Sequence, residues 1–345
     1  MQRLALQFSE PYRVKIVEEP VPDPSQNQVL VSTVVSAISP GTELLLYRGQ
    51  WPENLPVDST IQALTGKFAF PLKYGYAAVG RVTALGPNVD EGWLGRLVFA
   101  FNPHESHFVA MPEDLIPVPD SLSPEEAALL PNMETAVNFM MDGRPLIGEA
   151  VAVFGQGVVG LLTTALLARL PLCILVTLDG LPLRREKSKA LGAHSVLDPS
   201  QEDISEQVQR LLDGRGCGSG TDLTYELSGN PTALDQAIAL TGFNGRIVVG
   251  SWYGSKRANI DLGGQFHRSR IRIMSSQVST LAPDLTGRWT KSRRLGLALR
   301  MLSEVQPAGL ITHRYHISQA EEAYQLLDQN QQEAIQVMLT YEDVQ

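Results

Sequence analysis

The sequence predicts an α/β protein with two domains, a β-rich N-terminal domain and a doubly wound parallel-sheet domain. Many short apolar strands lie close together in roughly the first third of the chain. Strands and helical segments then alternate, which favours a parallel sheet with right-handed crossovers. A glycine-rich turn opens this second part, at residues 155–160.

Composition fits a two-domain enzyme. The chain has 345 residues, 43% of them hydrophobic, and a net charge of −9, which argues against a nucleic-acid partner. No apolar stretch is long enough to span a membrane, and the N-terminus lacks a signal-peptide core. Two cysteines, Cys173 and Cys217, cannot build a disulfide framework or a zinc ribbon. These features predict a cytoplasmic protein with neither a membrane nor a nucleic-acid partner.

The N-terminal part reads as strands separated by turns rich in proline, glycine and aspartate. We expect strands at 14–19, 28–35, 75–85, 95–101, 106–111 and 115–118. A helix should start at Ser123, because serine at the cap is followed by proline and two acids. A second helical run covers 133–141.

The second part alternates strands and helices. The expected strands are 150–154, 173–178, 195–198, 222–226, 245–250 and 271–275, with a closing strand inside 332–341. The expected helices are 161–170, 183–191, 204–212, 231–240, 293–305 and 318–329.

The glycine-rich turn has the G-x-G-x-x-G spacing of a dinucleotide site. Gly155 would make the tight turn, Gly157 would let a pyrophosphate approach the backbone, and Gly160 would let the helix pack against the strand. The intervening Gln156, Val158 and Val159 would line the same turn. The helix N-terminus then offers N–H groups to the phosphates.

The cofactor choice depends on Asp179, which ends the second strand about 20 residues beyond the glycines. A carboxylate there accepts ribose hydroxyls and repels a 2′-phosphate, which favours NAD. Arg184 and Arg185 follow in the next helix and leave NADP open.

The order of these segments resembles the medium-chain dehydrogenase/reductase superfamily over essentially the whole chain. The matching segments are 28–49, 73–86, 95–119, the glycine turn and Gly192-Ala193. The resemblance implies a GroES-like catalytic domain of residues 1–122 and 285–345 and a Rossmann nucleotide-binding domain of residues 123–284. It also implies a small-molecule substrate in a cleft between the domains, and a homodimer or homotetramer.

The resemblance adds further cofactor candidates at the ends of the later strands. Ser228 and Gly229 would lie near the adenosine ribose. Ser251, Trp252 and Tyr253 would approach the nicotinamide ribose, and Ser276 with Gln277 would lie near the nicotinamide.

Departures from the superfamily pattern argue against its catalytic zinc. Ser39 stands where zinc members carry a cysteine, and Tyr76 stands where they carry a histidine. The four-cysteine lobe that holds a structural zinc is absent. Since zinc in such sites prefers thiolate and imidazole, we expect no bound metal. The motif from Ser36 to Glu43 is similar to a zinc-less branch that contains bacteriochlorophyllide hydroxyethyl dehydrogenases.

Segments that line the cleft in the superfamily supply the candidate catalytic groups, since the developing charge on a substrate oxygen needs donors or acids. These candidates are Thr42, Glu43, Tyr76, His104, His107 and Glu134. His104-x-x-His107 fits a substrate-facing acid/base role with a pKa near neutral, a different metal site or two partly exposed loop histidines.

These residues predict an NAD(P)-dependent oxidoreductase that transfers hydride between nicotinamide and an alcohol or carbonyl without catalytic zinc. A zinc-less enoyl or quinone reductase is the first alternative. It needs no acid beside a carbonyl and usually prefers NADPH, against which Asp179 argues. A non-catalytic nucleotide-binding protein is the second alternative, and the polar cleft residues disfavour it.

Overall fold

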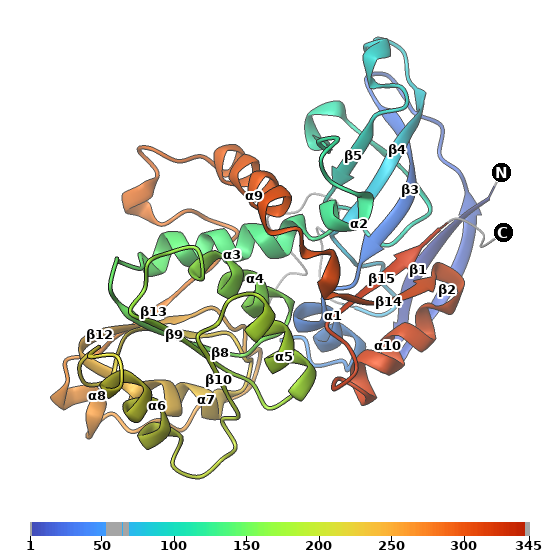
Figure 1. The fold of residues 1–345 in the computed structure, drawn as a ribbon. Helices are drawn as coiled ribbons and strands as arrows, with labels where there is room; N and C mark the ends of the chain where they lie inside the picture. Colours follow the sequence, from blue (N-terminus) through green and yellow to red (C-terminus); the bar gives the residue numbers. More distant parts are fainter. Residues whose placement is uncertain (1, 53–63, 65–68, 342–345) are drawn as a thin grey trace. The chain divides into compact units, whose positions relative to one another are not determined.

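The chain divides into two compact units. This computed structural model describes residues 2–52, 64 and 69–341. The first unit is Met1–Pro131 with Leu302–Gln345, and the second is Asn132–Met301. Helices α3 (Leu130–Gly143) and α9 (Lys291–Val305) run across the two junctions (Figure 1). The domain limits expected from the sequence stay a prediction.

The first unit is mostly β. Its strands are β1 Gln2–Glu10, β2 Arg13–Pro20, β3 Val29–Ala37, β4 Ala78–Leu85, β5 Leu97–Ala100, β6 His107–Ala110, β7 Ile116–Pro117, β14 Ile311–His316 and β15 Gln336–Thr340. Its helices are α1 Pro40–Tyr47, α2 Pro124–Ala127 and α10 Ala320–Gln329. Strands β1 and β2 pair as an antiparallel ribbon. In the described residues the larger sheet has the order β14-β15-β3-β4-β5-β7, with β6 paired to β3.

Two elements of this unit were not expected from the sequence. Strand β1 alternates buried and exposed side chains so irregularly that its period is hard to read. Helix α1 has a proline at its first turn, and its residues from Glu43 to Tyr47 are all buried. Of these, Leu44, Leu46 and Tyr47 join side chains of α10 and β15 in one apolar core, which explains why a short helix forms here.

The second unit contains a parallel sheet, as the sequence predicted. Its strands are β8 Ala150–Phe154, β9 Ile174–Leu178, β10 Ser195–Leu197, β11 Thr221–Glu226, β12 Thr241–Val249 and β13 Arg272–Ser275. Besides α3 and α9, its helices are α4 Val158–Leu167, α5 Pro182–Ala190, α6 Ile204–Asp213, α7 Pro231–Leu240 and α8 Gln265–Arg268. The strand order is β10-β9-β8-β11-β12-β13, with every neighbouring pair parallel.

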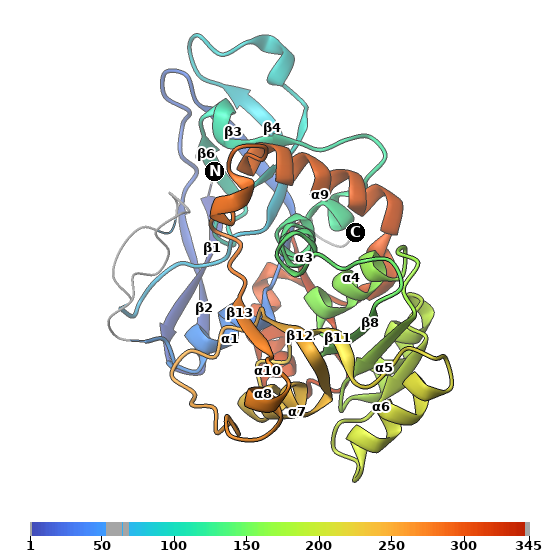
Figure 2. The same cartoon turned by 90° about the vertical axis from the view of Figure 1, so that its left-hand side faces the viewer.

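Helices cover both faces of this sheet (Figure 2). Alternate residues of β8 face opposite sides: Ala152 packs in the core that includes α6 and α7, whereas Val153 packs in the core that includes α3 and α4. This alternation follows from the period of two in a strand. The strand order reverses between β8 and β11, and ligands of such sheets bind at the carboxyl ends beside that reversal. The predicted doubly wound α/β fold is therefore confirmed.

Candidate active site

The three glycines of the turn after β8 differ in what surrounds them. Gly155 has a φ of +86°, and a Cβ there would lie 2.5 Å from the Cα of Ser228. A Cβ on Gly160 would lie 2.0 Å from the carbonyl oxygen of Gly155. Nothing lies within 4 Å of a Cβ built on Gly157. The first and third glycines therefore serve packing inside the unit, and the second leaves an open approach to the backbone.

Helix α4 begins at this turn with an uncapped end. Gly157 is its N-cap residue and offers no side chain to the first-turn N–H groups. The side chain of Gln156 does not reach them either, because its Oε1 accepts from the hydroxyl of Thr164 at 2.9 Å and its Nε2 donates to the carbonyl of Gly155 at 3.1 Å. An anion at this helix end would meet backbone donors and the positive end of the helix dipole. The turn thus fits a pyrophosphate.

Asp179 lies next to the glycine turn, one residue past β9. Its Oδ2 accepts from the backbone N–H of Gln156 at 2.7 Å and its Oδ1 from that of Leu181 at 2.8 Å. The guanidinium of Arg184 lies 3.9 Å from Oδ2. Arg185 does not bond the Asp179 carboxylate: its Nη1 donates to the Asp179 backbone carbonyl at 2.7 Å and to the carboxylate of Asp198 at 3.1 Å. The carboxylate is where a ribose hydroxyl would need it, with one arginine beside it.

A buried carboxylate that the sequence reading missed ties together two of the predicted cofactor loops. Glu226, the last residue of β11, is fully buried and accepts hydrogen bonds from the Ser228 backbone N–H and hydroxyl and from the Tyr253 phenol. Burial and the Glu226 charge raise the pKa of Tyr253 above its usual range. Ser251 Oγ accepts from the N–H of Gly229 at 2.8 Å. The two loops therefore form one bonded group beside Gly155.

The loop after β13 is held by polar contacts to α3. Ser276 Oγ donates to Asp142 Oδ2 at 2.5 Å and accepts from Asn138 Nδ2 at 2.9 Å. Gln277 bonds instead to Ser279, through its Oε1 and the Ser279 N–H. Ser276 thus anchors this loop, which was expected near the nicotinamide, and its hydroxyl is already used.

Glu134 does not have the catalytic surroundings expected for it. It forms an ion pair with Arg294, whose guanidinium is fully buried and donates to Oε1 at 3.0 and 2.9 Å. Arg294 also donates to Asn138 Oδ1 at 2.5 Å and to the carbonyl oxygen of Val278. Burial raises the pKa of Glu134, and the arginine opposes that shift. The pair fastens the loop after β13 to α3 and α9, which is a structural task.

Two hydroxyls meet in the first unit at the positions of Ser39 and Tyr76. The Tyr76 phenol donates to Ser39 Oγ. Ser39 precedes α1 and its backbone N–H donates to Glu43 Oε1 at 2.7 Å. Glu43 is fully buried and also accepts from the phenol of Tyr324. Both Ser39 and Tyr76 are only half-buried. The two residues that carry the hydroxyls are thus partly exposed, and the carboxylate beside them is buried.

His104 completes the buried layer beneath this pair. Its Nε2 lies 3.1 Å from Glu43 Oε2 and its Nδ1 lies 2.6 Å from the hydroxyl of Ser36, which is 2.7 Å from the Tyr341 phenol. The histidine has no exposed surface. Gly75, with φ +120°, passes so close that a Cβ would lie 2.7 Å from the imidazole. Glu43 and His104 can therefore position the hydroxyls but cannot touch a substrate.

The remaining two candidates lie at the edges of this group. Thr42 is half-buried in the first turn of α1, between Ser39 and Glu43 along the helix. His107 lies at the start of β6, where its Nδ1 is 3.1 Å from Ser106 Oγ and burial lowers its pKa. No hydrogen bond among the described residues links His107 to Glu43, and the substrate-facing acid/base role of His107 stays a prediction.

Comparison with known proteins agrees with the fold. Residues 158–293 match the zinc-binding dehydrogenase family model. Sorbitol dehydrogenase of Bacillus subtilis is 24% identical over 94% of this chain and 94% of its own length. The crystal structure of 2R,3R-butanediol dehydrogenase from the same species superposes with a TM-score of 0.80 at 20% identity, covering 99% of this chain and 100% of that one. The structure of an alcohol dehydrogenase from Escherichia coli complexed with NADH superposes with a TM-score of 0.79 at 19% sequence identity, covering 99% of both chains.

The chain is similar to medium-chain alcohol dehydrogenase-like proteins. Its dehydrogenase relatives support an NAD(P)-dependent oxidoreductase, as the sequence predicted. In this medium-chain dehydrogenase-like chain no helix among the described residues is long and apolar enough to cross a membrane.

The donor set of this dehydrogenase-like protein does not fit the zinc that its family model names. Ser39 and Tyr76 are neutral oxygen donors bonded to each other, and Glu134 is paired with Arg294. Zinc in catalytic sites takes thiolate, imidazole or carboxylate ligands. Within residues 2–52, 64 and 69–341, no group of three such side chains is close enough to hold a metal ion.

Several groups in this dehydrogenase-like site lie far apart in the sequence, and no local pattern marks them. Tyr324 and Tyr341 reach Glu43 and Ser36 from the C-terminal return, across more than 280 residues. Glu226 could have been predicted from the sequence, because it ends a parallel strand just as Asp179 follows one.

Proposed function

We propose that this protein is an NAD-dependent oxidoreductase that interconverts an alcohol and a carbonyl compound without a catalytic zinc. The observation that carries the proposal is the hydrogen bond between Tyr76 and Ser39, at the two positions where zinc relatives place their ligands. The nucleotide-type glycine turn and Asp179 support the cofactor assignment.

The hydroxyl pair can supply the proton that carbonyl reduction needs. The cofactor, when bound, supplies or accepts the hydride. Since the Tyr76 phenol donates to Ser39 Oγ, the Ser39 hydroxyl keeps its own proton for a further acceptor. A substrate oxygen at that position would receive the proton of Ser39, and Ser39 would be reprotonated by Tyr76. Two hydroxyls in series polarise each other, which strengthens the final hydrogen bond.

The buried layer keeps the pair in place. Glu43 fixes the Ser39 backbone, and His104 together with Tyr324 satisfies the remaining lone pairs of the carboxylate. Because all three are buried, they hold the first turn of α1 rather than exchange protons with a substrate. We assign the chemistry to Ser39 and Tyr76, and positioning to Glu43 and His104.

Tyr76→Phe should lower kcat for NADH-linked reduction by roughly 100-fold, the lower range for removal of a general acid. The affinity for NADH should change little, since Tyr76 belongs to the other unit. Steady-state rates with a panel of small aldehydes and ketones, together with fluorescence titration of NADH, measure both quantities. Tyr12→Phe, at an exposed tyrosine, is the matched control. An unchanged kcat in Tyr76→Phe would remove the phenol from the mechanism.

The Asp179 carboxylate favours NADH over NADPH. A 2′-phosphate would place a second negative charge against a carboxylate that already accepts two backbone N–H bonds. We expect NADH to bind at least about tenfold more tightly, and Asp179→Ser to narrow that ratio, because Arg184 would then face the phosphate unopposed. Fluorescence titration of both cofactors measures the ratio. Equal affinities in the unaltered protein would support the NADPH-preferring enoyl or quinone reductase instead.

The setting of the reaction is also part of the proposal. We expect a small-molecule substrate, a cytoplasmic location and a homodimer or homotetramer. The low sequence pI of about 5.2 supports the absence of a nucleic-acid partner.

A further inference from the structure

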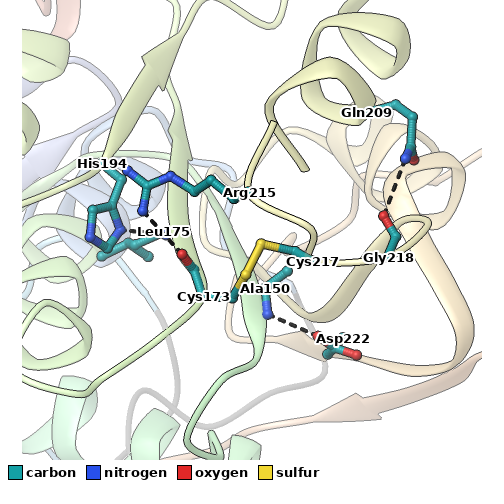
Figure 3. The surroundings of a disulfide bond; sticks show 9 residues. All are labelled: Ala150, Cys173, Leu175, His194, Gln209, Arg215, Cys217, Gly218 and Asp222. Atoms are coloured by element: carbon teal, nitrogen blue, oxygen red, sulfur yellow. Dashed lines mark hydrogen bonds between the residues drawn. A yellow bond between two sulfur atoms is a disulfide. The ribbon is translucent and has the colours of Figure 1, made fainter. Parts of the chain in front are cut away.

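The second unit contains a disulfide bond between Cys173 and Cys217, the only two cysteines of the chain (Figure 3). Cys173 directly precedes β9, and Cys217 lies in the loop between α6 and β11. The sequence reading excluded a framework of several disulfides and did not consider this single pair. The bond joins residues 44 positions apart.

The disulfide lies at the edge of the sheet opposite the glycine turn. The first residue of β8, Ala150, donates its N–H to Asp222 at the start of β11 at 2.8 Å, and both lie beside the cystine in Figure 3. Strand β8 then runs five residues to Phe154, just before Gly155. Five residues of strand span about 16 Å. Forming or breaking the disulfide can therefore affect the glycine turn only by way of the intervening sheet.

Cys217 belongs to a glycine-rich loop, and its own backbone N–H donates to the carbonyl of Leu212 at 3.0 Å. Glycines occupy positions 214, 216, 218 and 220, and the last three have positive φ. Outside the cystine, the loop is held by Gln209, which bonds the carbonyl of Gly218 at 3.2 Å and the N–H of Gly220 at 3.1 Å. Arg215 donates to the carbonyl of Cys173 at 3.1 Å. Glycine-rich, exposed backbone of this kind opens at low cost, so the covalent link contributes much of its order.

The sulfurs are placed for exchange with dissolved thiols. Both cysteines are half-buried rather than enclosed, and the Arg215 guanidinium is beside Cys173. A nearby cation favours the thiolate, which is the form that attacks a disulfide. In a reducing compartment such a bond is usually transient and redox-responsive, and not permanent.

We propose that Cys173 and Cys217 form a reversible redox site that sets the stability of the nucleotide-binding unit. In the reduced protein, one thiolate attacks a low-molecular-weight disulfide such as oxidised glutathione and releases one glutathione thiol. The other cysteine then attacks the protein sulfur of this mixed disulfide and releases the second. Two protein thiols are oxidised and one glutathione disulfide is reduced to two thiols. Excess dithiol reverses the sequence.

The disulfide should raise the melting temperature because it lowers the conformational entropy of the unfolded chain. By chain entropy, closing a loop of this length in a unit of this size should raise the melting temperature by about 5–15 °C. Cofactor affinity should change less than about twofold at temperatures where both forms are folded, because the contacts at the glycine turn are untouched. This inference does not depend on the proposed function.

The full-length protein tests this directly. After treatment with oxidised glutathione, alkylation and mass spectrometry should find no free thiol, and after dithiothreitol under native conditions they should find two. Thermal melts should differ by the stated amount and recover over a full cycle. Cys173→Ser and Cys217→Ser should each melt like the reduced protein, and oxidised glutathione should not restore the higher melting temperature in either. If either variant fails to fold, the reduced unaltered protein carries the comparison.

Three outcomes would overturn the proposal. In the first, each thiol forms a mixed disulfide with glutathione but the two cysteines do not bond each other. In the second, the disulfide forms without shifting the melting temperature. In the third, dithiothreitol cannot reduce the disulfide in the folded protein.

Discussion

Arg294→Met is expected to destabilise the second unit by about 3–5 kcal/mol, the cost of removing one partner of a buried ion pair. Arg294 is fully buried, and its loss leaves the buried carboxylate of Glu134 without its hydrogen-bonded ion-pair partner. It also leaves the carbonyl oxygens of Val278 and Thr280 without this donor. For a unit of this size the melting temperature should fall by about 6–20 °C. Calorimetric melts measure it.

The pH dependence of that loss identifies its cause. With Arg294 gone, the Lys291 charge alone opposes the effect of burial on Glu134, so its pKa in the folded state should rise further above the unfolded value. The loss of stability in Arg294→Met should then be full at neutral pH. It should shrink as the pH falls through the raised folded-state pKa of Glu134, because the protonated acid is no longer a buried charge.

Two matched variants separate charge from packing. Arg294→Met combined with Glu134→Met should recover most of the stability, since a buried pair can be replaced by apolar groups of similar volume. Arg300→Met, at an exposed arginine of the same helix, should cost well under about 1 kcal/mol. A double variant as unstable as the single one would show that the pair is not the source of the loss.

Gly157→Ala is expected to weaken NADH binding by roughly 10- to 100-fold while leaving the free protein as stable as before. A Cβ at Gly157 meets nothing within 4 Å, and its φ of −66° suits alanine, so the unliganded fold has no reason to change. A pyrophosphate against this backbone would meet the added methyl group, and such overpacking costs about 1–3 kcal/mol.

The matched control is Gly296→Ala in the middle of α9, where a Cβ also meets nothing within 4 Å. It should leave NADH binding unchanged and raise stability by about 0.5–1 kcal/mol, as alanine does in a helix. Isothermal titration and thermal melts of both variants give the comparison. If Gly157→Ala binds NADH as well as the unaltered protein, no phosphate approaches this turn.

Most elements of the second unit could be predicted from the sequence, because the patterns that indicate them are local. The buried strand β8, the glycine spacing and Asp179 follow each other within 30 residues, and each has a meaning for the backbone. The strand and helix alternation then fixes a parallel sheet. What could not be predicted is which side chains are already bonded, such as Gln156 turned toward Thr164.

The candidate catalytic residues were harder to predict because their contacts join distant segments of the chain. Glu43 and His104 were identified as candidates, but nothing in their spacing of 61 residues showed that they meet, or that both are buried. Glu134 appeared to be an acid near the cleft until Arg294, 160 residues further on, proved to be its partner. Long-range pairing and burial decide the role of an ionisable group, and a single sequence shows neither.

The central claim is that hydroxyls replace a metal ion in this dehydrogenase-like chain. Elemental analysis by mass spectrometry of protein purified without chelators, from zinc-supplemented medium, tests it most directly. The account predicts far less than one zinc per chain and NADH-linked activity that survives dialysis against EDTA. One tightly bound zinc per chain, lost together with activity on chelation and restored with it, would contradict the account.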